Sequence, residues 1–128
     1  MSKRCPFCFP PAERVFLETD GVLGIWDGFP VSPGHALIVP RRHVATWFEA
    51  DESEKAALVA AIDAAKTEIE NAHQPDGYNI GVNLGEAAGQ TIEHLHVHLS
   101  PRYAGDVPNP VGGVRGVIPG KSDYLEDK

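Results

Sequence analysis

The segment 94–99 reads His-Leu-His-Val-His-Leu, with three histidines at every second position and aliphatic residues between them. Successive side chains of a β-strand point to opposite faces, so this spacing predicts the three imidazoles on one face and the aliphatic side chains on the other. An unperturbed imidazole titrates near pH ~6.5, and a row of imidazoles can therefore supply a nucleophile, hydrogen-bond donors and proton transfer at neutral pH. The pattern predicts an active site along this face.

A second group of residues with chemical potential lies near the N-terminus. Both cysteines of the chain, Cys5 and Cys8, fall in one Cys-x-x-Cys motif. In a reducing compartment this spacing favours metal binding or redox chemistry over a disulfide framework. A thioredoxin-like redox role would need a surrounding βαβ pattern, which this sequence lacks. Zinc in a structural site would need two further ligands, commonly histidines.

Composition limits the function classes. The 128 residues fit one compact domain, and we expect a single domain over residues 1–128. The formal net charge of −7 argues against a long nucleic acid as the main partner, although a local pocket can still bind a small anion. No apolar run approaches membrane-spanning length, and the basic N-terminus is followed by Cys and Pro instead of an apolar signal region. We therefore expect a soluble, cytoplasmic protein with no membrane partner.

Alternating and helical patterns place these motifs on an α+β fold. Segments 15–19 and 22–26, joined by Asp20-Gly21, predict a hairpin, and segment 35–40 predicts a third strand that a proline ends. From Asp51 to about His73 the period becomes about 3.6, and Asp51 with Glu54 forms an N-terminal capping pair. The apolar stripe of this predicted helix comprises Leu58, Ile62, Ala65, Ile69 and Ala72.

Two further strands are predicted over residues 77–84 and 92–99, separated by a Gly-rich loop over residues 85–89. Together these elements predict an antiparallel β-meander of about five strands with one long helix on one face. We expect the helix to cover Leu95, Val97 and Leu99. The Gly- and Pro-rich tail, about residues 104–128, is predicted to run over the surface without regular structure.

Two segments resemble the signatures of the histidine triad (HIT) family of nucleotide hydrolases and transferases. The first is segment 94–99, preceded by Gly-Gln-Thr at 89–91 and followed by Pro-Arg at 101–102. The second is Pro-Gly-His-Ala-Leu-Ile-Val-Pro at 33–40, with His43 after it. The resemblance spans roughly residues 22–102 in the family's order. One departure is Ser100, which stands where the family pattern has a second apolar residue.

The resemblance implies an enzyme that cleaves a nucleoside monophosphate conjugate at its α-phosphate. His96 would attack phosphorus and form a nucleotidyl-histidine intermediate that water hydrolyses, with no metal in the chemical step. The implied catalytic residues are His96, His98 and His94. The implied substrate-binding residues are Ile25, Asp27, Phe29, His35, Asn83, Gly89, Gln90 and Thr91. Asp27 would hold the ribose, Ile25 and Phe29 the base, and His35 would orient the triad.

The same resemblance accounts for the Cys-x-x-Cys motif. Some HIT proteins hold a structural zinc ion with an N-terminal Cys-x-x-Cys, a histidine after the second signature and the first triad histidine. Cys5, Cys8, His43 and His94 match these positions. His94 would lie about 7 Å along a strand from His96, which leaves the nucleophile unligated. The resemblance also implies a homodimer with a purine nucleotide as its small-molecule partner.

Other interpretations stay open at this point. A catalytic zinc ion could be held by three histidines, with His35 as one ligand, because His94 and His98 are too far apart to share one ion along a strand. A nucleotide-binding module with incidental turnover would use the same residues as the enzyme. The substrate branch is also open, since Asn83 resembles the branch that cleaves phosphoramidates and Gln90-Thr91 the branch that cleaves dinucleoside polyphosphates.

Overall fold

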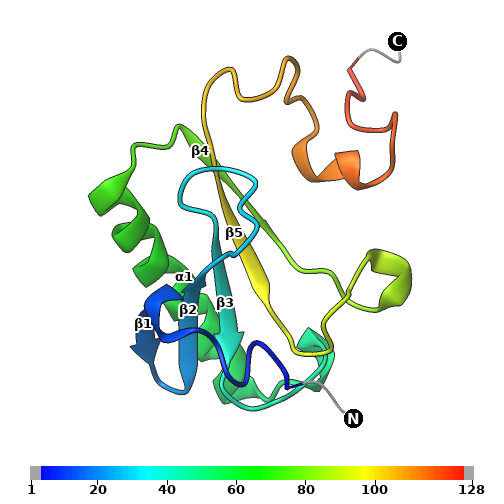
Figure 1. The fold of residues 1–128 in the computed structure, drawn as a ribbon. Coiled ribbons are helices and arrows are strands. Elements are labelled where there is room, and N and C mark those ends of the chain that lie inside the picture. Colours follow the sequence, from blue (N-terminus) through cyan, green and yellow to red (C-terminus); the bar gives the residue numbers. More distant parts are fainter. Residues whose placement is uncertain (1–3, 126–128) are drawn as a thin grey trace.

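The computed structural model describes residues 4–125 as an antiparallel sheet with one long helix (Figure 1). The strands are β1 (Val15–Thr19), β2 (Val22–Trp26), β3 (Ala36–Pro40), β4 (Gly77–Gly81) and β5 (Val97–Arg102). The helix α1 covers Glu52–Ala72, and short 3-10 turns cover Ala12–Arg14, Trp47–Glu49, Glu86–Ala88 and Gly113–Val117. The predicted α+β class, with five antiparallel strands and one helix, is confirmed. Within residues 4–125, no helix is long and apolar enough to cross a membrane.

The strand order departs from the sequence order at one place. The sheet runs β1-β2-β3-β5-β4, so only its first three strands form the expected meander. After helix α1 the chain does not return to a position next to β3. Instead, β4 forms the outer edge of the sheet and leaves a gap that β5 fills. The last strand, β5, then pairs with β3 on one side and with β4 on the other. This crossover places the histidine segment in the interior of the sheet instead of at its edge.

Two loops depend on backbone conformations that glycine adopts easily. At the β1–β2 turn, Asp20 and Gly21 have φ values of 46° and 77°, the positive values that a tight hairpin turn requires. Before β3, Gly34 has φ of 87°, and a Cβ built on it would lie 3.0 Å from the His73 ring and 3.1 Å from Ile69. The loop therefore approaches the end of α1 in a way that only glycine permits.

Helix α1 begins at the predicted capping pair. Asp51 accepts a hydrogen bond from the Glu54 main-chain N–H at 2.8 Å, and the Glu54 carboxylate accepts one from the Asp51 N–H at 2.9 Å. The helix ends where the His73 N–H donates to the Ile69 carbonyl. Its buried residues are Leu58, Ala61, Ala65 and Ile69.

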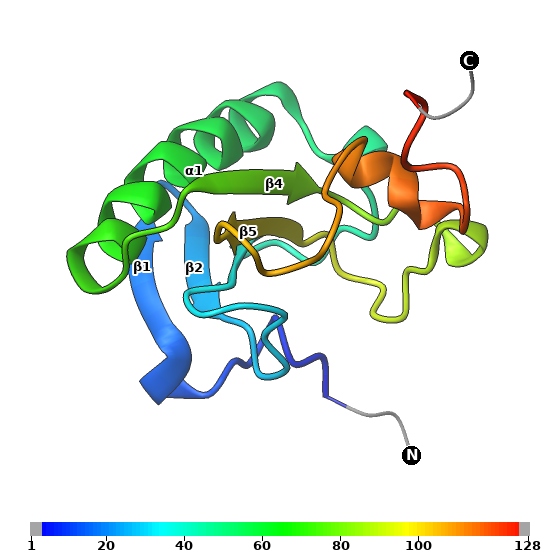
Figure 2. The same cartoon turned by 90° about the horizontal axis from the view of Figure 1, so that it is seen from above.

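The two faces of the sheet have different coverings. Figure 2 shows α1 on one side of the sheet and the N-terminal segment on the other. On the helix side, α1 packs against a cluster that includes Leu95, Val97 and Leu99, as predicted from their alternation. On the opposite side, Phe7 packs with Leu23, Ile25, Leu37 and Val39. The face without the helix is the one that carries the histidines.

The histidine segment is only partly a strand. The sequence predicted a strand over residues 92–99, whereas β5 begins at Val97 and continues to Arg102. Leu95 donates its N–H to the Val44 carbonyl at 2.7 Å, so the preceding residues are held by the loop after β3. His94 and His96 therefore lie before β5, and His98 lies within it. In the tail, Gly113–Val117 forms a 3-10 turn where irregular chain was expected.

Candidate active site and metal centre

A cavity of about 420 Å³ lies on the helix-free face, between the N-terminal segment, the β2–β3 loop and the histidine segment. Most of the predicted site residues line it: Ile25, Asp27, Phe29, His35, Asn83, Gly89, Thr91, His96 and His98. The remaining lining residues are Pro6, Phe7, Pro10, Pro11, Arg14, Trp26, Gly28, Val31, Leu37 and Ile92. Its walls are mainly apolar with a smaller number of polar groups, which is the usual composition of a small-molecule site.

His96 has the ring orientation of a nucleophile. Its Nδ1 lies 2.8 Å from the main-chain carbonyl of His94, and a carbonyl can only accept. Nδ1 therefore carries the proton, and Nε2 keeps its lone pair. The side chain is 9% exposed and lines the cavity, so this lone pair is available to a bound ligand and largely shielded from bulk water.

A hydrogen-bond chain fixes the tautomer of His98. Val31 donates its N–H to Nδ1 of the buried His35 at 3.1 Å, so the proton of neutral His35 sits on Nε2. That Nε2 lies 3.0 Å from Nδ1 of His98, which must accept. The proton of His98 is then on its own Nε2, where it can donate to a ligand. These hydrogen bonds make His98 a donor, and the neighbouring His96 carries a free lone pair.

Burial favours the neutral forms of His35 and His98. Burial lowers the pKa of His35 below its ordinary value, and the nearby carboxylate of Asp27 opposes that shift. Burial is also the largest cause that lowers the pKa of His98, followed by the proximity of His96 and of His35. Asp27 lies 3.4 Å from His35 Nε2 and accepts a hydrogen bond from the Phe29 N–H at 2.7 Å. The Asp27 carboxylate is thus held at the cavity wall by its own loop.

The same three residues could be considered as metal ligands. One donor atom from each of Asp27, His35 and His98 lies within 4.8 Å of the others. However, Nδ1 of His35 accepts from Val31, so neutral His35 has no second lone pair for an ion. The hydrogen-bond chain accounts for the 3.0 Å distance between His35 and His98 without an ion. The geometry therefore favours proton-bearing groups here over a catalytic zinc site with His35 as one ligand.

Gln90 differs from the other predicted substrate-binding residues. Its amide nitrogen donates to the carbonyls of Ala45 and Ile92, and its amide oxygen accepts from the Gly85 N–H. These contacts close the loop over residues 85–90 and tie it to the segment after β3. Gln90 is thereby engaged with the main chain, whereas Asn83 faces the cavity.

A second cluster joins the Cys-x-x-Cys motif to two histidines, as the family resemblance implied. The donor atoms of Cys5, Cys8, His43 and His94 all lie within 4.8 Å of one another. Nδ1 of His94 lies 3.4 Å from Sγ of Cys5, 3.5 Å from Sγ of Cys8 and 3.2 Å from Nδ1 of His43. Four ligands around a tetrahedral zinc ion lie about 3.3–3.8 Å apart, so two thiols and two imidazoles at these distances fit such an ion.

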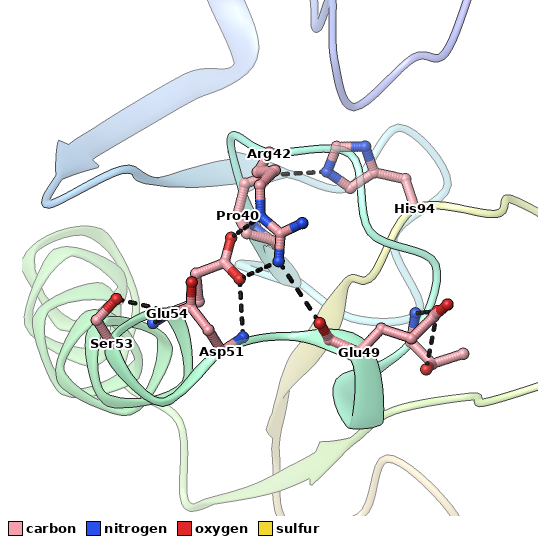
Figure 3. Close-up of polar contacts among 8 residues, drawn as sticks. Pro40, Arg42, Glu49, Asp51, Ser53, Glu54 and His94 are labelled. Carbon is pink, nitrogen blue, oxygen red and sulfur yellow. Dashed lines mark hydrogen bonds and ion pairs between the residues drawn. The ribbon is translucent and has the colours of Figure 1, made fainter.

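The main chain prepares His94 for this role. Nε2 of His94 lies 2.7 Å from the Pro40 carbonyl, which fixes the proton on Nε2 and leaves Nδ1 free to ligate (Figure 3). Burial is the main cause that lowers the pKa of His94, so its neutral, ligating form is favoured. His94 does not line the cavity, in contrast to the other two histidines of its motif.

An ion pair supports the segment that carries His43. Its neighbour Arg42 donates to both carboxylate oxygens of Glu54, at 2.9 and 2.7 Å, and Glu54 also caps α1 (Figure 3). The Arg42 side chain further reaches the Glu49 carbonyl. The loop after β3 is thereby fastened to the first turn of the helix, directly beside a metal-ligand candidate.

Among the lining residues that sequence reasoning did not name, Phe7 and Arg14 carry the largest consequences for the site. Phe7 lies between the two cysteines, and its position inside the Cys-x-x-Cys motif was the one available signal. Arg14 lines the cavity beside Gly28, where a Cβ would lie 3.2 Å from the Arg14 Cζ and overlap its Nη1. The sequence carries no local signal for this contact, because it depends on the packing of the first 3-10 turn against the loop after β2.

Comparison with known proteins identifies a family that matches most of the chain. The model of the HIT domain matches residues 11–105. The AP-4-A phosphorylase of Mycobacterium tuberculosis is 41% identical over 86 residues, which cover 66% of this chain and 44% of that protein. The asymmetrical bis(5'-nucleosyl)-tetraphosphatase of Schizosaccharomyces pombe is 34% identical over 98 residues, covering 77% of this chain and 54% of that protein. The chain thus spans about half the length of these two relatives.

Solved structures show the same fold. A zinc-bound histidine triad family protein from Mycobacterium smegmatis superimposes with a TM-score of 0.71 at 33% identity, covering 80% of this chain and 77% of that one. This zinc-bound neighbour is similar to the chain in sequence as well as in fold.

Proposed function

The chain belongs to the HIT domain family, and on that premise we propose that it cleaves nucleoside monophosphate conjugates at the α-phosphate through a nucleotidyl-histidine intermediate. The observation that carries the proposal is the His96 ring, whose Nδ1–H is held by the His94 carbonyl at 2.8 Å and whose Nε2 lone pair is free at the cavity. An imidazole becomes an effective nucleophile when a neighbour holds its other nitrogen as a donor.

In the first step, Nε2 of His96 forms a bond to the α-phosphorus, and the bond from phosphorus to the leaving group breaks. The leaving group departs with the bond's electron pair and takes up a proton from solvent water. The negative charge on the non-bridging oxygens meets Nε2–H of His98, whose tautomer His35 fixes. In the second step, water attacks phosphorus and loses a proton to solvent, and the phosphorus–nitrogen bond breaks with its electron pair returning to Nε2 of His96. The nucleoside monophosphate then leaves, and His96 is restored.

The cavity supports a nucleotide of this kind. Asp27 presents a carboxylate that can accept from ribose hydroxyls, while Ile25 and Phe29 offer apolar surface to a base. The Phe29 side chain is 92% exposed, so a bound base would cover apolar surface that otherwise faces water. Asn83, Gly89 and Thr91 lie on the wall near the histidines, where they can contact the phosphate.

Two substrate classes are proposed, and each has its own support. Asn83 faces the cavity while Gln90 is engaged with main-chain groups, which favours a phosphoramidate. The names of the two relatives above, a phosphorylase of AP-4-A and a tetraphosphatase, favour a dinucleoside polyphosphate. The base in both cases is taken to be adenine, and the product to be AMP.

The test is AMP release from an adenosine phosphoramidate and from a diadenosine polyphosphate, with the wild type and His96→Ala side by side. We expect the wild type to release AMP from at least one substrate, and His96→Ala to lose several orders of magnitude in turnover while AMP affinity changes little. His73→Ala, which removes a histidine at the end of α1, is the matched control with full turnover. Near-normal turnover by His96→Ala, or no release by the wild type, would refute the proposal.

We further propose that Cys5, Cys8, His43 and His94 hold a structural zinc ion, supported by the donor distances and by the zinc-bound neighbour. No step of the proposed reaction passes through that ion. We propose a homodimer from the family resemblance and a cytoplasmic location from the sequence composition. Light scattering on the purified protein and fractionation of cells test them.

A further inference from the structure

Phe7 connects the two clusters of the molecule. It lies with Pro6 between Cys5 and Cys8, and its side chain is only 9% exposed. Its ring centroid lies 4.8 Å from that of His96, at an interplanar angle of 49°, and 6.0 Å from that of His94, edge to face. One aromatic ring is therefore in contact with the proposed nucleophile and with a proposed metal ligand.

The loop that carries Phe7 is fixed on both sides. Behind the ring, the apolar side chains of β2 and β3 form a buried cluster with it. Around the loop, the Phe9 N–H donates to the Cys5 carbonyl at 3.1 Å and closes the turn. Cys8 follows Phe7 directly and Cys5 lies two residues before it, and their thiols contact the metal-ligand candidates His43 and His94. A metal ion bound by the two cysteines and the two histidines would therefore hold the Phe7 ring against His96.

We propose that Phe7 is a positioning residue for His96, and that the metal-binding loop acts on the reaction through this ring. The inference rests on the proposed function for its kinetic readout. A second link has the same direction, because the main-chain carbonyl that orients His96 belongs to His94, whose side chain lies in the metal cluster. The His94 carbonyl thus holds Nδ1 of His96, and Phe7, which lies between Cys5 and Cys8, contacts the His96 ring.

The physical effect is on ring orientation. The His94 carbonyl fixes one atom of the imidazole, and a hydrogen bond to one atom still leaves the ring free to tilt about it. Phe7 limits that tilt and keeps water off one ring face. A misplacement of about 1 Å in a reacting group can lower a rate by about 100-fold. We therefore expect the loss of Phe7 to lower kcat more than it raises KM.

The first experiment compares Phe7→Ala and Phe7→Leu with Phe9→Ala. Phe9 lies two residues along the same loop and is 58% exposed, so its replacement is the matched control. Phe7→Leu keeps apolar volume behind the ring and guards against a folding defect in Phe7→Ala. We expect kcat to fall about 10- to 100-fold in both Phe7 variants, with about one metal per chain retained, and to be unchanged in Phe9→Ala. Wild-type kcat in Phe7→Leu would overturn the positioning role.

The second experiment tests the connection to the metal loop. Removing the metal with a chelator should lower kcat in the wild type, and should lower it much less in Phe7→Leu, since the ring contact is already lost. An equal fold-loss in both proteins would overturn the action through Phe7.

The ¹⁵N resonances of the His96 ring give a readout independent of activity. We expect the wild type to show one Nδ1-protonated tautomer, and chelation or Phe7→Leu to shift and broaden the His96 ring resonances as the imidazole becomes free to tilt. An unchanged ring signal in both would refute the inference even if no substrate were turned over. Failure of the proposed function would instead appear as absent AMP release with the His96 ring signal still responding to Phe7.

Discussion

The neutral pair of His35 and His98 predicts that folding stability falls as the pH is lowered below about 6.5. Burial lowers the pKa of both side chains in the folded protein, whereas an unfolded chain has histidine pKa values near 6.5. Between these values the unfolded chain binds more protons than the folded one, so stability is fully present above pH 6.5 and is lost as the pH falls toward the folded-state pKa values.

The size of the effect follows from the linkage. Each group that is neutral when folded and protonated when unfolded contributes at most about 1.4 kcal/mol per pH unit. The pair therefore contributes at most about 2.7 kcal/mol per pH unit, a substantial part of a typical stability of 5–15 kcal/mol. His35→Gln removes one titrating group and the positive charge that would oppose protonation of His98. The slope of stability against pH should fall by about half or more in this variant.

Urea unfolding at several pH values from 7.5 to 5.5 measures this slope. The metal ligands also take up protons as the pH falls, so the wild type and His35→Gln, which share the metal cluster, are compared with each other. His35→Gln is expected to be less stable at pH 7.5, because two buried hydrogen bonds are altered, and to lose less stability on acidification. Identical slopes in the two proteins, or a wild type that gains stability as the pH falls, would refute the reasoning.

Three further outcomes are expected. The purified protein should contain about one metal ion per chain, and Cys5→Ser should lower both metal content and Tm; metal-free protein of unchanged Tm would contradict the structural site. Leu58→Ala, at a fully buried position, should cost about 2–5 kcal/mol in urea unfolding, whereas Val59→Ala, at a position 56% exposed, should stay within about 0.5 kcal/mol; equal losses would contradict the packing of α1. Gly28→Ala should displace Arg14, which lines the proposed nucleotide cavity, and should therefore raise the KM for the nucleotide conjugate by up to about tenfold with kcat little changed. Gly81→Ala, with open space around it, should not raise the KM.

The predictable part of the fold is the part encoded by local periodicity. The hairpin at Asp20-Gly21, the capping pair at Asp51 and Glu54, and the helix-facing row of Leu95, Val97 and Leu99 each depend on residues close in sequence, and all were confirmed. The order of the strands depends on which strands pair across long separations, and alternation carries no information about partners. The placement of β5 between β3 and β4 was therefore outside the reach of the pattern.

The candidate site divides in the same way. The residue types and their order along the chain indicated both histidine clusters, because the motif spacing and the family resemblance name the side chains. What each side chain does was less accessible. Gln90 was expected at the substrate, but its amide finds three main-chain partners in a loop whose path only the structure gives. Phe7 was not considered, because its contact with His96 joins segments about 90 residues apart.

The three histidines of the motif have the same side chain and regular spacing, so their different roles must come from their hydrogen-bond partners. The Pro40 carbonyl accepts a hydrogen bond from Nε2–H of His94, and Nδ1 of His94 faces the cysteines. The His94 carbonyl accepts a hydrogen bond from Nδ1–H of His96, which leaves Nε2 with its lone pair. His35 donates to Nδ1 of His98 and keeps a proton on the opposite nitrogen. Each partner fixes one tautomer, and the tautomers suit a metal ligand, a nucleophile and a hydrogen-bond donor in that order. Of these three partners, His35 acts through its side chain, so replacing it should change the role of His98 without changing the motif itself.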